Sequence, residues 1–156
     1  MEDFFGSIYC WFESFFGQPL ADYLWGYNCD TQAYDNPNIF NQIGWYCFLS
    51  AFIICCLYYY LFNPVRSQRI WWFITWGITG IVNLFIGFGF TCSDLANGLI
   101  GDCLLYPNGD TTLHPLIETS HCWWFGGINF IVSLGFFILF SYLIKWGSSN
   151  CKYYPF

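Results

Sequence analysis

Three apolar stretches constrain this chain most: Ile43–Phe62, Ile70–Phe90 and Trp123–Ile144. An α-helix rises about 1.5 Å per residue, so about 20 residues are enough to cross a hydrocarbon core of about 30 Å. Only 9% of the residues are charged, whereas soluble domains carry about 25%. The sequence therefore predicts an all-α integral membrane protein, with three transmembrane helices in a single membrane domain of residues 1–156.

The charged residues separate onto the two sides of such a three-helix fold. Arg66 and Arg69 lie in the turn between the first two spans, and Lys145 and Lys152 follow the third. The ten carboxylates all fall on the opposite side: Glu2, Asp3, Glu13, Asp22, Asp30, Asp35, Asp94, Asp102, Asp110 and Glu118. Because cytoplasmic loops are enriched in Lys and Arg, we expect the N-terminus outside and residues 145–156 in the cytoplasm.

The sequence contains no signal that separates a bacterial inner membrane from a mitochondrial one, and we expect the bacterial one. The net charge of -6 argues against a nucleic-acid partner, because nucleic-acid binding needs a basic surface. The expected partners are membrane lipids and either other membrane-protein subunits or further copies of the chain.

Residues 1–42 precede the first span and are expected to form an outer helix and loop. Apolar residues recur here at steps of three and four: Phe4, Phe5, Ile8, Phe12, Phe15 and Phe16. This spacing predicts an amphipathic helix, which residues 17–19 (Gly-Gln-Pro) would end. We expect this helix to lie along the outer leaflet of the membrane. Because it contains no basic residue, we expect it to pack against protein rather than to bind anionic lipid. The Asn- and Asp-rich residues 27–42 predict a loop.

Residues 91–122 connect the second span to the third and predict a structured extracytoplasmic loop. Residues 106–110 (Tyr-Pro-Asn-Gly-Asp) are a strong reverse-turn signal, because proline fixes φ and glycine allows a positive φ. Residues 104–106 and 111–113 on either side would then pair as a short β-hairpin.

Small and polar side chains mark one face of each predicted span. On the second span Thr75, Thr79 and Asn83 follow one another at four-residue steps, so they share a helix face. The third span contains Asn129 and Ser133, and the first contains Ser50. Counted from the outer ends of the spans, Ser50, Asn83 and Asn129 lie at the same depth, about seven residues in.

Two kinds of role explain such a polar face. The first is helix packing, in which buried amides bond across helices for about 0.6 to 2 kcal/mol each. The second is a polar-lined ligand site or the wall of an oligomeric pore. The predicted spans contain no ionisable Asp, Glu, His, Lys or Arg, and ion pathways normally contain one. Packing is therefore the favoured interpretation.

Five of the nine cysteines fall in the outer segments: Cys10, Cys29, Cys92, Cys103 and Cys122. An oxidising compartment permits disulfides there. A Cys10–Cys29 bridge would hold the N-terminal helix, and Cys92–Cys122, or Cys103 with either of these two, would hold the loop. Sequence alone does not select among the pairings.

No catalytic, cofactor-binding or metal-binding residues are predicted. The sequence has no CxxC pair, nucleophile elbow or phosphate-binding glycine loop. His114, Glu118 and His121 lie near one another in sequence, but Pro115 disturbs the helix that would align them, and a zinc site needs three or four converging ligands.

The expectation for function is accordingly a small, non-catalytic structural or anchoring subunit of a larger membrane complex, such as a secretion or respiratory complex. The high aromatic content, 26%, supports this expectation because aromatic side chains are enriched at protein interfaces. The first alternative is a self-assembling pore or small channel lined by Thr75, Thr79 and Asn83. The second is a thiol-based membrane oxidoreductase.

Overall fold

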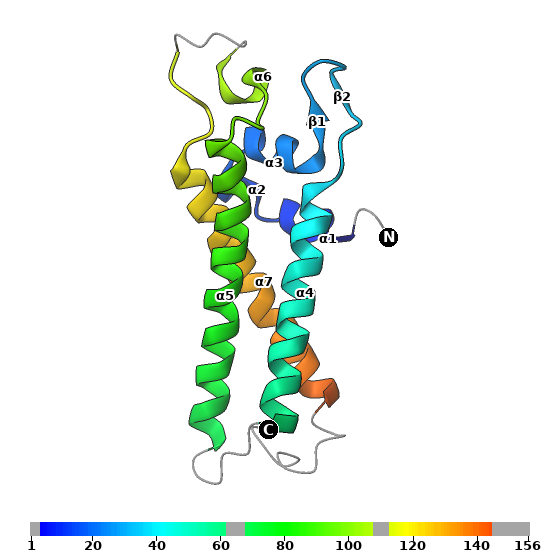
Figure 1. Ribbon diagram of the computed structural model, residues 1–156, viewed down its shortest axis with the longest axis vertical. Coiled ribbons are helices and arrows are strands. Elements are labelled where there is room, and N and C mark those ends of the chain that lie inside the picture. The colour runs from blue at the N-terminus through cyan, green and yellow to red at the C-terminus, as the bar shows by residue number, and fades with distance from the viewer. Residues whose placement is uncertain (1–3, 62–67, 108–112, 145–156) are drawn as a thin grey trace.

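The computed structural model describes residues 4–61, 68–107 and 113–144. Three long helices run along its length (Figure 1): α4 (Ile39–Cys56), continued by the π-helical turn η1 (Leu57–Leu61), α5 (Gln68–Ala96) and α7 (Thr119–Ile144). All three are long and apolar enough to cross a membrane. The predicted three-helix fold is thereby confirmed, and it fits an integral membrane protein.

At one end, called the outer end after the orientation that the sequence predicts, the helices extend beyond the predicted spans. Helix α4 begins at Ile39 because the Asn38 side chain caps it, accepting a hydrogen bond from the Asn41 amide at 3.0 Å. Helix α5 runs on to Ala96 and ends in a Schellman turn, in which Gly98 has a positive φ of 67° and the Leu99 amide donates to the Asp94 carbonyl. The outer ends of the long helices therefore rise past the apolar stretches.

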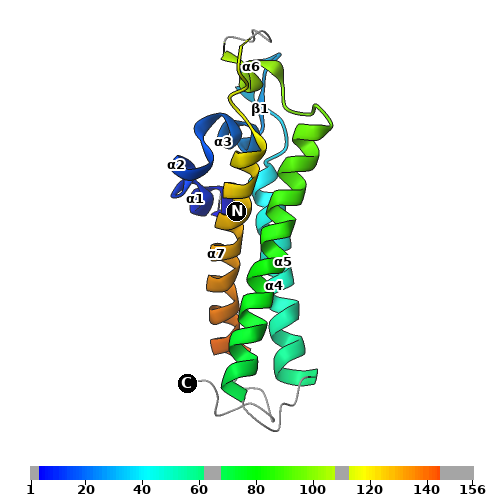
Figure 2. The same ribbon diagram turned by 90° about the vertical axis from the view of Figure 1, so that its left-hand side faces the viewer.

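Short elements form a cap at this outer end: α1 (Phe4–Cys10), α2 (Glu13–Phe16), α3 (Gln18–Trp25), β1 (Tyr27–Asn28), β2 (Ala33–Tyr34) and α6 (Asp102–Leu105). Helix α1 packs mainly against α4 and helix α2 against α7, below the tops of the long helices (Figure 2). Phe5 of α1 contacts Phe48 of α4 and Phe136 of α7. The cap therefore reaches down the side of the bundle as well as covering its end.

The prediction of a single amphipathic helix at the N-terminus is wrong, because the segment forms two short helices, α1 and α2, with a break at residues 11–12. Gly17 separates α2 from α3 with a φ of 85°, but Gln18 and Pro19 begin α3 instead of belonging to the break. Proline is favoured in the first turn of a helix because its missing amide has no partner there. The six apolar residues do not share one face either, because Phe5 and Phe16 are buried whereas Phe4 and Phe15 are exposed.

The hairpin predicted around residues 106–110 is also corrected. Leu104 and Leu105 belong to the helical turn α6, and the Leu105 carbonyl accepts a hydrogen bond from the Leu116 amide at 2.7 Å. Residues 108–112 lie outside the described residues. Two short antiparallel strands occur instead at β1 and β2, where the Tyr27 and Tyr34 rings are in contact.

The described residues form two buried clusters. One joins α1–α3 to the outer parts of α4 and α7 and contains Phe5, Tyr9, Phe16, Leu20, Leu24, Phe40, Ile43, Phe125 and Ile128. The other lies toward the inner end and contains Ala51, Cys55, Tyr58, Tyr59, Trp72, Phe137 and Phe140. At the level of the first cluster α5 and α7 approach closely, and a side chain at Gly126 would meet the Leu84 carbonyl oxygen at 2.9 Å. Small residues at this crossing let the two backbones pack directly.

Candidate functional site

A polar layer lies between the two apolar clusters and joins all three long helices. The Ser50 hydroxyl on α4 donates to Asn83 Oδ1 on α5 at 2.8 Å. Asn129 Nδ2 on α7 donates to the Asn83 backbone carbonyl at 2.7 Å. The structure therefore brings Ser50, Asn83 and Asn129 together, in agreement with the equal depth at which the sequence places them.

The cap contributes the fourth member of this layer, which sequence reasoning missed. The Tyr9 hydroxyl of α1 donates to Asn129 Oδ1 at 2.5 Å, and the Tyr9 ring stacks on Phe40. Burial, together with the nearby Cys47 thiol, raises the pKa of Tyr9 well above its usual value. Like an ordinary tyrosine, the phenol is protonated at neutral pH, and it acts as a donor.

The remaining polar residues of the predicted face bond within their own helices. Thr75 Oγ1 donates to the Trp71 carbonyl, Thr79 Oγ1 to the Thr75 carbonyl and Asn83 Nδ2 to the Thr79 carbonyl. Ser133 Oγ donates to the Phe130 carbonyl. Thr79, Asn83, Asn129 and Ser133 are buried, whereas Thr75 is partly exposed. Thr75, Thr79 and Ser133 thus lie on the predicted faces but outside the bonds that link helices.

A second polar contact lies near the inner end and was not predicted as a site. Ser141 Oγ on α7 accepts a hydrogen bond from Trp72 Nε1 on α5 at 3.0 Å and is hydrogen-bonded to the Tyr59 hydroxyl of η1. The signal that points to it is the aromatic pair itself, because buried Tyr and Trp need partners for their polar atoms.

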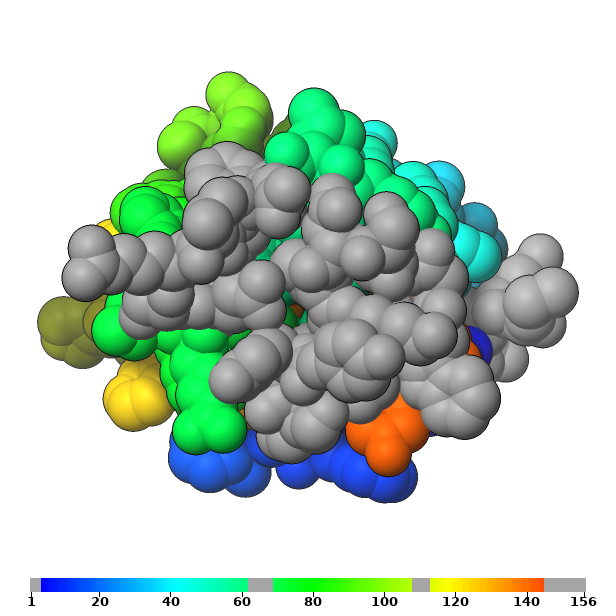
Figure 3. Space-filling model, turned by 90° about the horizontal axis from the view of Figure 1, so that it is seen from below, coloured from blue at the N-terminus to red at the C-terminus, as the bar shows by residue number. Residues whose placement is uncertain are grey.

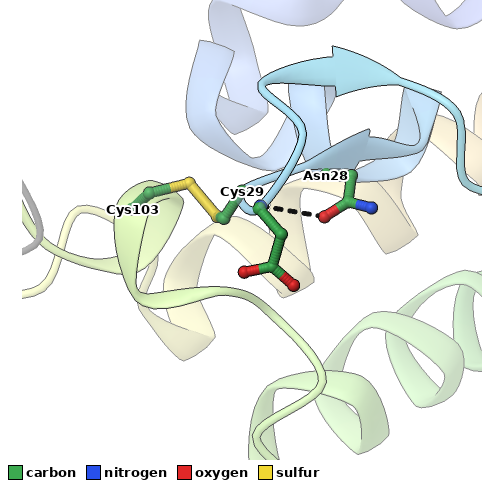
Figure 4. The surroundings of a disulfide bond; sticks show 4 residues. Asn28, Cys29 and Cys103 are labelled. Carbon is green, nitrogen blue, oxygen red and sulfur yellow. Dashed lines mark hydrogen bonds between the residues drawn. A yellow bond between two sulfur atoms is a disulfide. The ribbon is translucent and has the colours of Figure 1, made fainter.

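One disulfide ties the outer segments together. Cys29, directly after β1, is bonded to Cys103 of α6 (Figure 4), across a sequence separation of 74 residues. The Asn28 side chain accepts a hydrogen bond from the Asp30 amide beside the bridge. Gly101 packs against the Cys29 sulfur so closely that no side chain fits there. The predicted Cys10–Cys29 pairing is therefore wrong, since Cys29 is used by Cys103.

The other predicted outer cysteines are free thiols. Cys10 accepts a hydrogen bond from Trp25 Nε1 at 3.1 Å. Cys92 on α5 and Cys122 on α7 are not bonded to each other, nor is either bonded to Cys103. Which cysteines come together depends on how the cap folds, which sequence spacing does not fix.

A cleft opens between the cap and the outer end of α5. Its walls include Tyr23 of α3 and Asp94 of α5, and the Tyr23 hydroxyl is hydrogen-bonded to the Asp94 carboxylate. Burial first, and the Asp94 charge second, raise the pKa of Tyr23. This cleft was not predicted, because Asp94 reads in the sequence as one of ten similar outer carboxylates.

Within the described ranges, no three His, Cys, Asp or Glu side chains converge in a way that would hold a metal ion. His121 Nδ1 instead accepts a hydrogen bond from the Glu118 amide at 3.0 Å. Comparison with protein-family models, with curated proteins and with solved structures finds no match to this chain.

Proposed function

We propose that this chain is a small, non-catalytic structural or anchoring subunit of a larger membrane complex, of which secretion and respiratory complexes are examples. The main support is the saturation of the polar layer. Asn83 uses its side-chain oxygen, its side-chain nitrogen and its backbone oxygen in hydrogen bonds to Ser50, Thr79 and Asn129. A layer whose groups bond one another stabilises helix packing and has little capacity left for a substrate.

The aromatic surface of the cap supports a protein partner. Trp11 is 82% exposed, and Phe4 of α1 and Phe15 of α2 are also exposed. Seen from the inner end, the N-terminal helices project past the outline of the long helices beside α7 (Figure 3). Protein interfaces are enriched in aromatic residues, and Trp is common among the residues that contribute most to binding.

Purification from the native membrane in mild detergent tests the proposal. We expect the chain to elute with further proteins, which mass spectrometry identifies. A photo-activatable amino acid in place of Trp11 is expected to join it to one of them. The same amino acid in place of Ile81, an exposed residue of α5, serves as the matched control and is expected to label lipid. Elution as an isolated monomer, with Trp11 also labelling only lipid, contradicts the proposal.

The orientation forms part of the proposal. We infer that the cap faces the oxidising outer side and the C-terminus the cytoplasm of a bacterial inner membrane. The Cys29–Cys103 bridge supports this inference, because disulfides persist in oxidising compartments. A fluorescent protein that matures only in the cytoplasm, fused to the C-terminus, is expected to fluoresce. If the fusion at the N-terminus fluoresces and the fusion at the C-terminus does not, the orientation is the reverse of the one inferred.

Direct tests address the two alternative functions, a pore and a thiol oxidoreductase. Reconstituted protein that conducts ions, with the flux abolished by Asn83→Leu, would indicate a pore. The full burial of Thr79 and Asn83 between helices of one chain argues against that outcome. Cysteine alkylation followed by mass spectrometry tests the thiol oxidoreductase. A Cys29–Cys103 bridge that stays oxidised throughout supports a purely structural disulfide.

A further inference from the structure

The cleft between the cap and α5 has a volume of about 370 Å³ and combines several kinds of group. It is lined by Tyr23, Gly26, Asn36, Pro37, Ile39, Gln42, Phe90, Asp94 and Leu99. One carboxylate, two aromatic rings and two side-chain amides thus face a single space. A carboxylate next to aromatic rings is the arrangement that recognises ammonium groups, by charge and by cation–π attraction.

None of the four Lys and Arg residues belongs to the cap or to the outer ends of the long helices, where the charge in the cleft lies. The sequence contains no Lys or Arg before Arg66 and none between Arg69 and Lys145. The Asp94 carboxylate instead accepts a hydrogen bond from Tyr23. A positive charge from outside the chain is therefore the complementary occupant.

An apolar groove of about 350 Å³ adjoins the cleft along α5. It is lined by Phe85, Ile86, Gly89, Phe90 and Ser93, so Phe90 belongs to both spaces. Phe85 and Phe90 are exposed on the outside of the bundle, in the stretch of α5 that the sequence places at the outer end of the span. The groove therefore faces lipid, and the cleft lies about one helical turn further out, where headgroups lie.

We propose that the cleft and groove together bind one phospholipid whose headgroup contains an ammonium, as in phosphatidylethanolamine or phosphatidylcholine. The ammonium lies beside Asp94, Tyr23 and Phe90, and an acyl chain lies in the groove past Gly89. The amides of Asn36 and Gln42 supply donors for the phosphate. The apolar groove favours a lipid over a basic side chain of a partner protein, because only the lipid fills both spaces. This site does not depend on the proposed subunit function.

Native mass spectrometry of the purified full chain tests the site. The protein is mixed with phosphatidylethanolamine, phosphatidylcholine or phosphatidylglycerol of identical acyl chains. We expect an ammonium lipid to be retained about tenfold better than phosphatidylglycerol, the ratio that one charge-assisted contact supplies. Asp94→Asn, which keeps an acceptor for Tyr23, is expected to abolish the preference. Asp35→Asn is the matched control, since Asp35 is exposed and outside the cleft, and is expected to preserve it.

Two further measurements separate the contribution of the lipid headgroup from that of the acyl chains. Gly89→Leu fills the groove, where an added side chain meets nothing within 4 Å, and is expected to weaken retention of both lipids without changing the fold. Glycerophosphocholine, which has the headgroup without acyl chains, is expected to compete poorly. Equal retention of anionic and ammonium lipids, or a preference unchanged by Asp94→Asn, would overturn the site. Full competition by glycerophosphocholine would overturn the assignment to a lipid.

Discussion

Removing the contact between Tyr9 and Asn129 measures how strongly the cap stabilises the bundle. The Tyr9 hydroxyl donates to Asn129 Oδ1, and Asn129 Nδ2 in turn donates to the Asn83 carbonyl. Tyr9→Phe removes the first bond, together with the contact of the hydroxyl with the Cys47 thiol, and retains the ring that stacks on Phe40. Asn129→Ala removes both bonds. The double variant Tyr9→Phe/Asn129→Ala completes a cycle that isolates the interaction between the two side chains.

The magnitudes follow from the number of bonds each variant loses. Hydrogen bonds between membrane helices contribute about 0.6 to 2 kcal/mol each. Tyr9→Phe is therefore expected to lower the free energy of unfolding by about 1 kcal/mol. Asn129→Ala loses two bonds and leaves the buried phenol without its partner, so about 2 to 4 kcal/mol is expected. The coupling energy of the cycle is expected to be about 1 kcal/mol.

The assay is equilibrium unfolding in mixed micelles, with SDS as denaturant and circular dichroism as readout. The control cycle pairs Tyr9→Phe with Trp72→Phe, because Trp72 bonds to Ser141 in the inner polar contact and shares no partner with Tyr9. This control is expected to be additive. If the Tyr9/Asn129 cycle is additive as well, the cap does not bond to the polar layer and the reasoning fails.

Three further predictions concern packing, the bridge and pH. Gly126→Ala is expected to lower the free energy of unfolding by about 1 to 3 kcal/mol because its methyl group meets the Leu84 carbonyl. The control is Gly127→Ala, whose methyl group meets nothing within 4 Å and which is expected to be neutral or slightly stabilising in the same unfolding assay. Cys29→Ser is expected to cost up to about 4 kcal/mol, the loop-closure entropy for a separation of 74 residues, and to speed cleavage of the cap by a protease specific for acidic residues; unchanged stability and cleavage would contradict this. Burial raises the pKa of Tyr9 in the folded state above the unfolded value of 10.0. The contribution of Tyr9 to the free energy of unfolding is therefore complete below pH 10, and above pH 10 it falls by up to about 1.4 kcal/mol per pH unit. Titration of the unfolding midpoint from pH 9 upward is expected to show a slope that Tyr9→Phe reduces, and an equal slope in both proteins would refute the assignment.

The parts of the fold that sequence predicts well are those set by regular geometry. Long antiparallel helices have a fixed rise per residue, so counting inward places Ser50, Asn83 and Asn129 at one level. Tyr9 cannot be found by such counting. Its position depends on how deeply α1 docks, which is determined by packing contacts such as that of Phe5 with Phe136.

Local turn signals were less informative in the cap. The proline and glycine of residues 106–110 favoured a hairpin, but Leu104 and Leu105 form a helical turn in which both amides donate to the Gly101 carbonyl. The pairing of Cys29 with Cys103 likewise follows from contacts between α3, β1 and α6, where Gly101 allows close approach to the sulfur. These contacts are long-range, and sequence patterns contain no signal for them.

The Cys29–Cys103 bridge closes a covalent ring that contains both α4 and α5. In a bilayer, a protease that extracts its substrate by pulling on either terminus has to draw this helix pair out as a doubled strand. A single cut between α4 and α5 would leave the two halves joined until a reductant separates them. The bridge also constrains the order of assembly, because Cys103 follows α5 in the chain and can bond Cys29 only after both helices have been made.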